Sequence, residues 1–371
     1  MKKNKLLLFF ICACLYLLVG CQNEKQHASP PSEAPAEKEE KLEFIEPNSV
    51  DSTGFIENIG WVNTSEIMTV REENGNTAIY IHNLHNQQEK RIYEVTAPYV
   101  QAVLSPDKEK VFIHTAPLTY SADITIIDLK GNELFQQEIP SYELYYSWNS
   151  FNSNFLVIAS FAEDWSFEVF TVDIEKKQMD KMDVAEPFLQ WKAENSVIYQ
   201  SWSTMDISFT APLIAQNIFN GEKETIVEES MHFKQFRSNL LSIEIENEND
   251  NLFSYKFINE NGKIQSSFNL PLLSRYSDWL VPYYDMIEDE DTFLTFVAGA
   301  GGTVDSYDGN FSLRAWNLKT GEEEILLEDL LNEPLQCSQD GAYCLYGMQL
   351  EKVIDITEKK TITLLKEGKE S

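Results

Sequence analysis

Residues 99–139, YVQAVLSPDKEKVFIHTAPLTYSADITIIDLKGNELFQQEI, hold four short apolar segments separated by turn signals. The segments are YVQAVLSPD, KVFIHTA, DITIIDL and ELFQQEI, and β-branched and aromatic residues of the kind that favour strands recur in them. The stretch therefore predicts a unit of four strands. Its third strand ends at an acidic residue, Asp128, immediately before a turn.

The same strand, Asx residue and turn recur along the chain. An Asx side chain at the end of a strand can bond backbone groups of the turn, which is a structural role that needs no chemistry. The spacings between successive positions are 45, 45, 44, 42, 58 and 38 residues. The seven positions are Asn83, Asp128, Asp173, Asn217, Asn259, Asn317 and Asp355.

A period near 44 residues with four strands per unit is typical of a β-propeller. The sequence thus predicts an all-β fold, a β-propeller of four-stranded blades, with seven units counted between about residues 54 and 365 and six blades as the alternative. A pair of β-sandwiches is the competing fold, but it would not repeat one turn at one period. The propeller is expected over residues 44–366, followed by a C-terminal tail, 367–371.

The N-terminus has the parts of a signal peptide over residues 1–20. MKKNK is basic, and LLLFFICACLYLLV (6–19) is uncharged and too short to span a bilayer. Leu18-Val19-Gly20-Cys21 resembles the lipobox of bacterial lipoproteins. That resemblance implies that Cys21 is diacylated and becomes the mature N-terminus, since two acyl chains hold a protein stably at a membrane.

Residues 21–43 continue from this cysteine into a Pro-, Ala- and Glu-rich segment that has too little apolar surface to fold. We interpret it as a disordered tether. Lipobox, tether and propeller together resemble the YqgU-like propeller lipoproteins of Bacillus-type bacteria. The resemblance implies a six-bladed propeller, held by its lipid on the outer face of the cytoplasmic membrane of a Gram-positive type of cell, and it brings no catalytic residues.

The formal net charge is −31. Such a chain repels phosphate backbones, and no Lys/Arg cluster counters this, so nucleic acid is not an expected partner. Two thiols, Cys337 and Cys344, flank SQDGAY, in which Asp340-Gly341 is a hairpin signal. Counting outward from that turn pairs the two cysteines at a hydrogen-bonded position, about 5.5 Å apart at Cα. They are a disulfide candidate, with two buried free thiols as the alternative.

Motifs of known chemistry are absent from the sequence: it has no G-x-S-x-G, H-E-x-x-H, phosphate-binding glycine loop or C-x-x-C. No catalytic or metal-ligating residue is therefore predicted, and no cofactor is expected. Asp305, Asp308 and Asn310 in a Gly-rich segment would suit calcium, but their spacing does not match an EF-hand. The expected function is a non-catalytic binding or scaffold module for an envelope protein or ligand. The domain is expected to be monomeric. A hydrolase or lyase of envelope sugars or peptides is the alternative.

Three long connections are predicted between the second and third strands of units two, four and six, at 116–122, 203–212 and 299–310. Long loops on a rigid scaffold are where recognition usually resides. All three emerge on one face of a propeller, so we predict the binding site there. The predicted binding residues are Tyr120, Trp202, Asp206, Phe209, Asp305, Tyr307 and Asp308.

Overall fold

Each of the seven recurring Asx residues is the last residue of a strand and fixes the turn that follows it. Asp128 shows the arrangement: its Oδ1 accepts the backbone N–H of Lys130 at 2.8 Å and of Asn132 at 2.9 Å. Asn217 does the same with the N–H groups of Phe219 and Asn220. The predicted structural role of these side chains is confirmed, and it explains their recurrence.

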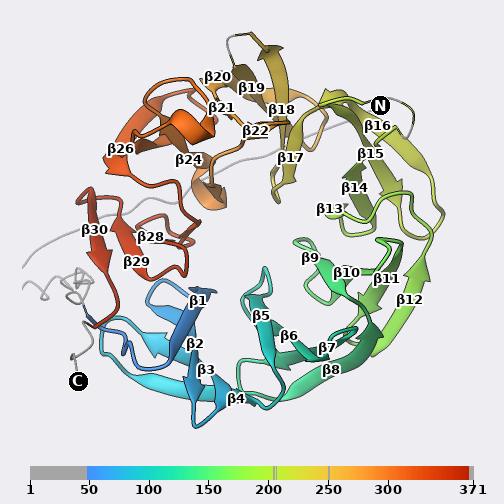
Figure 1. Ribbon diagram of the computed structural model, residues 1–371, viewed down its shortest axis with the longest axis vertical. Helices are drawn as coiled ribbons and strands as arrows, with labels where there is room; N and C mark the ends of the chain where they lie inside the picture. The colour runs from blue at the N-terminus through green and yellow to red at the C-terminus, as the bar shows by residue number, and fades with distance from the viewer. Residues whose placement is uncertain (1–47, 204, 206, 250, 367–371) are drawn as a thin grey trace, which may run out of the picture. The chain divides into compact units, whose positions relative to one another are not determined.

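The computed structural model describes residues 48–366, except 204, 206 and 250. The predicted signal peptide, Cys21, the tether, Asp206 and the tail 367–371 lie outside these residues. The described strands form seven four-stranded antiparallel sheets and one two-stranded sheet, and the seven sheets stand around a ring with their first strands innermost (Figure 1). The prediction of a seven-unit propeller is confirmed. No helix in the described part is long and apolar enough to cross a membrane.

The blades follow chain order, and their four strands are called a to d from the inside outward. Blades 1 to 3 contain β1 (Phe55–Trp61), β2 (Glu66–Glu73), β3 (Asn76–Asn83), β4 (Glu89–Val95); β5 (Tyr99–Leu104), β6 (Lys110–Leu118), β7 (Ser121–Asp128), β8 (Glu133–Pro140); and β9 (Glu143–Trp148), β10 (Phe155–Phe161), β11 (Phe167–Asp173), β12 (Gln178–Met182).

Blades 4 to 7 continue the pattern with β13 (Gln190–Ala193), β14 (Ser196–Gln200), β15 (Ala211–Asn217), β16 (Lys223–Ser230); β17 (His232–Gln235), β18 (Asn239–Asn247), β19 (Leu252–Asn259), β20 (Ile264–Pro271); β23 (Tyr284–Ile287), β24 (Thr292–Ala298), β25 (Phe311–Asn317), β26 (Glu323–Leu330); and β27 (Leu335–Cys337), β28 (Tyr343–Tyr346), β29 (Lys352–Asp355), β30 (Lys360–Thr363). The extra hairpin β21 (Leu273–Ser274) and β22 (Trp279–Leu280) joins blades 5 and 6.

The hydrophobic core is divided among the blade interfaces. Seven buried clusters are present in the described chain, and each is shared by two neighbouring blades. The cluster between blades 7 and 1 closes the ring. It contains Val50, which is fully buried and pairs in parallel with Leu365, and Trp61, whose Nε1 donates to the Gln336 carbonyl at 3.0 Å. Blades 1 and 7 come from opposite ends of the chain and share no strand. Side-chain packing and these hydrogen bonds therefore join the two blades.

Two of the three predicted long connections match the structure. Residues 299–310 link β24 to β25, with the short 3-10 helix η2 (Val304–Ser306) inside, and residues 201–210 link β14 to β15. The prediction at 116–122 was wrong, because β6 runs on to Leu118 and β7 begins at Ser121, leaving a two-residue turn. The register of β6 and β7 shifts between Thr115 and Leu118, and the two strands then pair again at Leu118 and Ser121 instead of opening into a loop.

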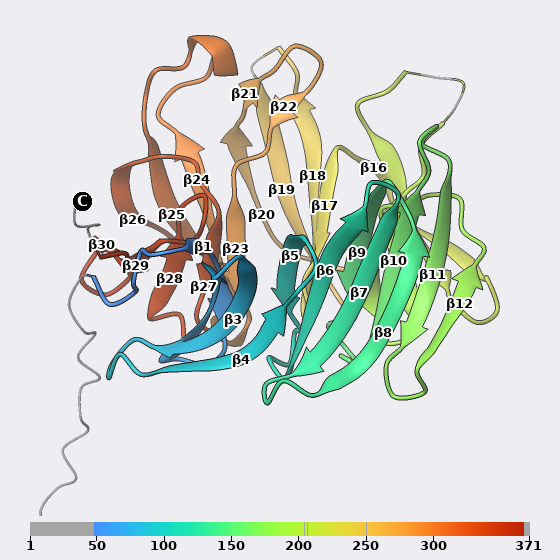
Figure 2. The ribbon, with the colours of Figure 1, turned by 60° about the horizontal axis from the view of Figure 1, so that its bottom comes forward.

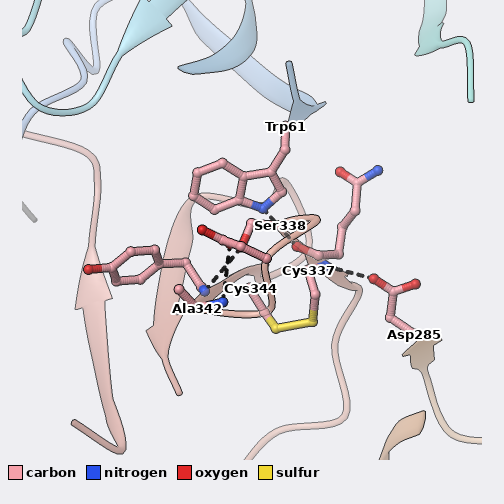
Figure 3. Close-up of a disulfide and its surroundings, with 9 residues drawn as sticks. Trp61, Asp285, Cys337, Ser338, Ala342 and Cys344 are labelled. Carbon is pink, nitrogen blue, oxygen red and sulfur yellow. Dashed lines mark hydrogen bonds between the residues drawn. A yellow bond between two sulfur atoms is a disulfide. The ribbon is translucent and has the colours of Figure 1, made fainter. Parts of the chain in front are cut away.

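The two thiols meet in the predicted pairing of β27 with β28, and their sulfur atoms are joined at 1.99 Å (Figure 3). The predicted hydrogen-bonded position was wrong. The Cys337 N–H donates to Asp285 Oδ2 of the preceding blade rather than across the hairpin, while the Ser338 N–H donates to the Tyr343 carbonyl. The cysteines therefore occupy a close, non-hydrogen-bonded pair, with Cα atoms 3.8 Å apart.

Candidate binding face

The connections from strand b to c and from strand d to the next blade emerge on one side of the propeller, which we call the loop face. Figure 2 shows the β21–β22 hairpin and the orange loop between β24 and β25 projecting from this side. Seventeen large hydrophobic side chains are exposed among the described residues, and fourteen stand in these connections or within two residues of them. The fourteen are Val100, Leu118, Tyr120, Tyr142, Trp165, Phe188, Trp202, Met205, Ile207, Phe209, Tyr276, Tyr283, Leu331 and Met348.

Charge is also divided between the two faces. The connections of the loop face carry one basic residue, Arg275, whereas the a–b and c–d turns of the opposite face carry eight. Acidic residues are frequent in the loop-face connections, and Glu163, Asp164, Asp278 and Asp305 are examples. The loop face therefore carries most of the exposed large apolar side chains of the described chain together with an excess of acidic over basic residues.

Aromatic side chains continue along the loop face over blades 2 and 3. Tyr120 and Tyr142 pack with ring centroids 5.7 Å apart, and the Tyr142 hydroxyl donates to Glu163 Oε2 at 3.2 Å. Trp165 stands edge-on to Phe161 at 6.0 Å. These rings come from the connections of two blades, so the propeller scaffold, and not local sequence, gathers them.

Trp165 differs from the other rings of this group in its backbone conformation. It lies in the turn between β10 and β11, is 71% exposed, and has a left-handed backbone with φ of +64°. A bulky side chain in that region is strained by about 1–2 kcal/mol, which Asn or Gly would largely avoid. Strained, exposed residues tend to be kept where function uses them. The sequence carried no signal for this residue, because φ cannot be inferred from AEDWS.

The predicted binding residues of blades 4 and 6 pack more locally. Phe209 lies edge-on to Trp279 of β22 at 5.1 Å, and Trp202 donates its backbone N–H to Glu186 Oε1 at 3.0 Å. The Tyr307 hydroxyl accepts the Gly299 N–H at 2.9 Å and donates to the Asn310 carbonyl at 2.6 Å. Tyr307 therefore ties its own loop together, while Phe209 joins two connections.

Among the described residues, the structure places all the predicted binding residues except Asp206 on the loop face, and no ring contact or side-chain hydrogen bond joins any two of them. Asp305 and Asp308 are exposed on the 299–310 loop. Ser274 N donates to the Gly302 carbonyl at 3.0 Å, which links that loop to the β21–β22 hairpin. No group of three or more His, Cys, Asp or Glu side chains is placed to hold a metal ion in the described part of the chain. Calcium at Asp305, Asp308 and Asn310 stays a prediction.

The inner strands add a cluster of charges that the sequence did not reveal. Asp285 on β23 lies within electrostatic range of Lys108, from the β5–β6 turn, and Lys234 of β17. Burial raises the pKa of the Asp285 carboxyl to about 6, although the Cys337 N–H and the two lysines act in the opposite direction. Partial burial also lowers the pKa of Lys108, whereas Lys234 is exposed on β17. Lys108, Lys234 and Asp285 belong to different blades and lie far apart in sequence, so their interaction cannot be seen before the propeller is folded.

Residues 83–347 match the YqgU-like 6-bladed beta propeller domain family, a span of more than half the chain. The chain belongs to this family. The matched segment contains five complete blades and parts of blades 1 and 7, whereas the YqgU-like propeller described above has seven four-stranded blades.

The uncharacterized lipoprotein YqgU of Bacillus subtilis (strain 168) is 23% identical to the YqgU-like chain over 360 residues, 97% of each chain. A crystal structure of an uncharacterized protein from Listeria monocytogenes EGD-e is 25% identical, with a TM-score of 0.80 over 87% of this chain and 98% of that one. An oligogalacturonate lyase from Vibrio parahaemolyticus has a TM-score of 0.55 at 13% identity over 82% and 88% of the two chains, which shows the fold alone.

Proposed function

We propose that the protein is a membrane-anchored, non-catalytic binding module that captures a basic protein of the cell envelope through its loop face. One observation carries the proposal: fourteen of the seventeen exposed large hydrophobic side chains in the described chain stand on this face. The oligogalacturonate lyase shares the fold, and no specific arrangement of groups within residues 48–366, leaving aside 204, 206 and 250, favours the alternative of a lyase or hydrolase.

Anchoring is proposed through the lipidated Cys21 and the tether that follows it. The B. subtilis relative is named a lipoprotein, which supports this part of the proposal. Mass spectrometry of the protein purified from membranes should show loss of residues 1–20 and the mass of a diacylglyceryl group, and Cys21→Ser should release the chain from the membrane. A full-length, membrane-retained Cys21→Ser variant would contradict it.

The binding part is tested by site-specific photo-crosslinking in intact cells. A photoreactive amino acid replaces Phe188 on the loop face, and a matched variant carries it at Phe219, an exposed aromatic on the opposite face. We expect a discrete cross-linked envelope protein from position 188 and none from position 219. Cross-linking from position 219 alone, or from neither, would contradict the proposal.

A further inference from the structure

A small pocket opens on the loop face between blades 2 and 3. Its volume is about 110 Å³, the room of three or four water molecules and therefore of one side chain rather than a larger ligand. Val100, Leu118 and Tyr142 form its apolar wall, and all three are exposed to solvent. Exposed apolar groups around a cavity are the usual setting for an anchoring side chain of a partner.

His114 lines this pocket and is only 8% exposed. Its Nδ1 is buried and has no hydrogen-bond partner in the described structure. The other ring nitrogen, Nε2, also forms no hydrogen bond in the described structure but is not shielded in this way, so it is the nitrogen that an external partner can reach. Burial lowers the pKa of His114, so the ring is neutral near pH 7 and one nitrogen can accept a hydrogen bond.

Glu143 supplies a negative charge at the same pocket. Its exposed side chain lines the opening and forms no ion pair or hydrogen bond in the described chain. No Lys or Arg lines the pocket, and Glu163 lies nearby, bonded to Tyr142. The pocket thus combines an apolar wall, an acceptor nitrogen and an unpaired carboxylate.

We propose that this pocket binds a lysine side chain of the partner. The methylene stem would pack on Val100, Leu118 and Tyr142, as lysine stems do on apolar surfaces. The ammonium group would donate to His114 Nε2 and pair with Glu143. This inference rests on the proposed function and names the chemistry by which the loop face recognises its partner.

The test uses the whole protein with carbon-13-labelled histidine and follows the His114 ring by nuclear magnetic resonance. Nα-acetyl-lysine N-methylamide is the probe, and Nα-acetyl-norleucine N-methylamide is its uncharged match. We expect saturable shifts of the His114 signals, with affinity at least tenfold weaker for the norleucine compound. Glu143→Gln should weaken lysine binding severalfold, and Glu260→Gln on the opposite face should not. His114→Phe assigns the signals, and the exposed Leu118→Ala gives a second variant that preserves the fold.

Absence of any His114 shift, equal affinity for the norleucine compound, or no effect of Glu143→Gln would overturn the lysine pocket. These outcomes are separate from failure of the proposed function. If the pocket fails while cross-linking at position 188 persists, the loop face binds its partner by other contacts. If lysine binds but no envelope protein is captured, the pocket stands and the proposed function falls.

Discussion

The Asp285 carboxylate accepts the backbone N–H of Cys337 at 2.6 Å, which ties blade 6 to the first strand of blade 7 beside the disulfide (Figure 3). The bond gives an N–H on the inner strand a partner in the neighbouring blade. It also holds the Asp285 carboxylate in a poorly hydrated position within electrostatic range of Lys108 and Lys234.

This position gives stability a pH dependence. The folded pKa of Asp285, about 6, lies above its ordinary value of 3.8, so the folded state holds the proton more tightly. Its contribution to stability is present below about pH 4 and is lost as the pH rises to about 6. Asp285→Asn should therefore gain about 2 kcal/mol relative to the wild type between pH 4 and pH 8. Urea unfolding at both pH values measures the difference, and an equal difference at both would contradict the prediction.

The disulfide between Cys337 and Cys344 should form in the exported protein as a local crosslink. It closes a short loop, so its removal should cost less than the roughly 3 kcal/mol expected for a 15-residue loop. Peptide mapping without reductant should recover the two cysteines in one linked peptide, and thermal unfolding of Cys337→Ser measures the loss. Two free thiols in the exported protein would leave the pair as ordinary core residues.

Trp165 is predicted to lower the stability of the fold slightly while contributing to partner binding. Trp165→Asn relieves the strain at φ +64°, so the free energy of unfolding should stay unchanged or rise by up to about 1 kcal/mol. Cross-linking from position 188 should fall at the same time, because the exposed ring is lost. A marked loss of stability would show instead that the contact of Trp165 with Phe161 is structural.

The blade repeat was predictable because each blade repeats the same local device. Asn83, Asp128 and their counterparts fix one turn per unit, and that turn is written in adjacent residues. The 58-residue spacing before Asn317 was visible too, but the β21–β22 hairpin within it was not. The strands of that hairpin are two residues long, too short to give a periodic pattern.

The candidate site was only partly predictable. The sequence placed Tyr120 and Phe209 on the loop face, because alternation of strands decides the face of a connection. It did not find Tyr142, Trp165 or His114, since their roles depend on packing between blades and on backbone angles. Tyr307 resembled an exposed aromatic in sequence, whereas its hydroxyl bonds within its own loop.

The central claim is that the loop face captures an envelope partner, and quantitative co-purification from the protein's own membranes tests it most directly. The loop-face variant combines Tyr120→Ser, Trp165→Ser and Tyr276→Ser, all at exposed positions, and the control combines Phe219→Ser with Ile264→Ser away from that face. We predict that wild type and control retain one basic envelope protein in equal amounts and that the loop-face variant, with unchanged thermal stability, loses at least nine-tenths of it. Equal retention by all three proteins, or loss in the control alone, would contradict the account.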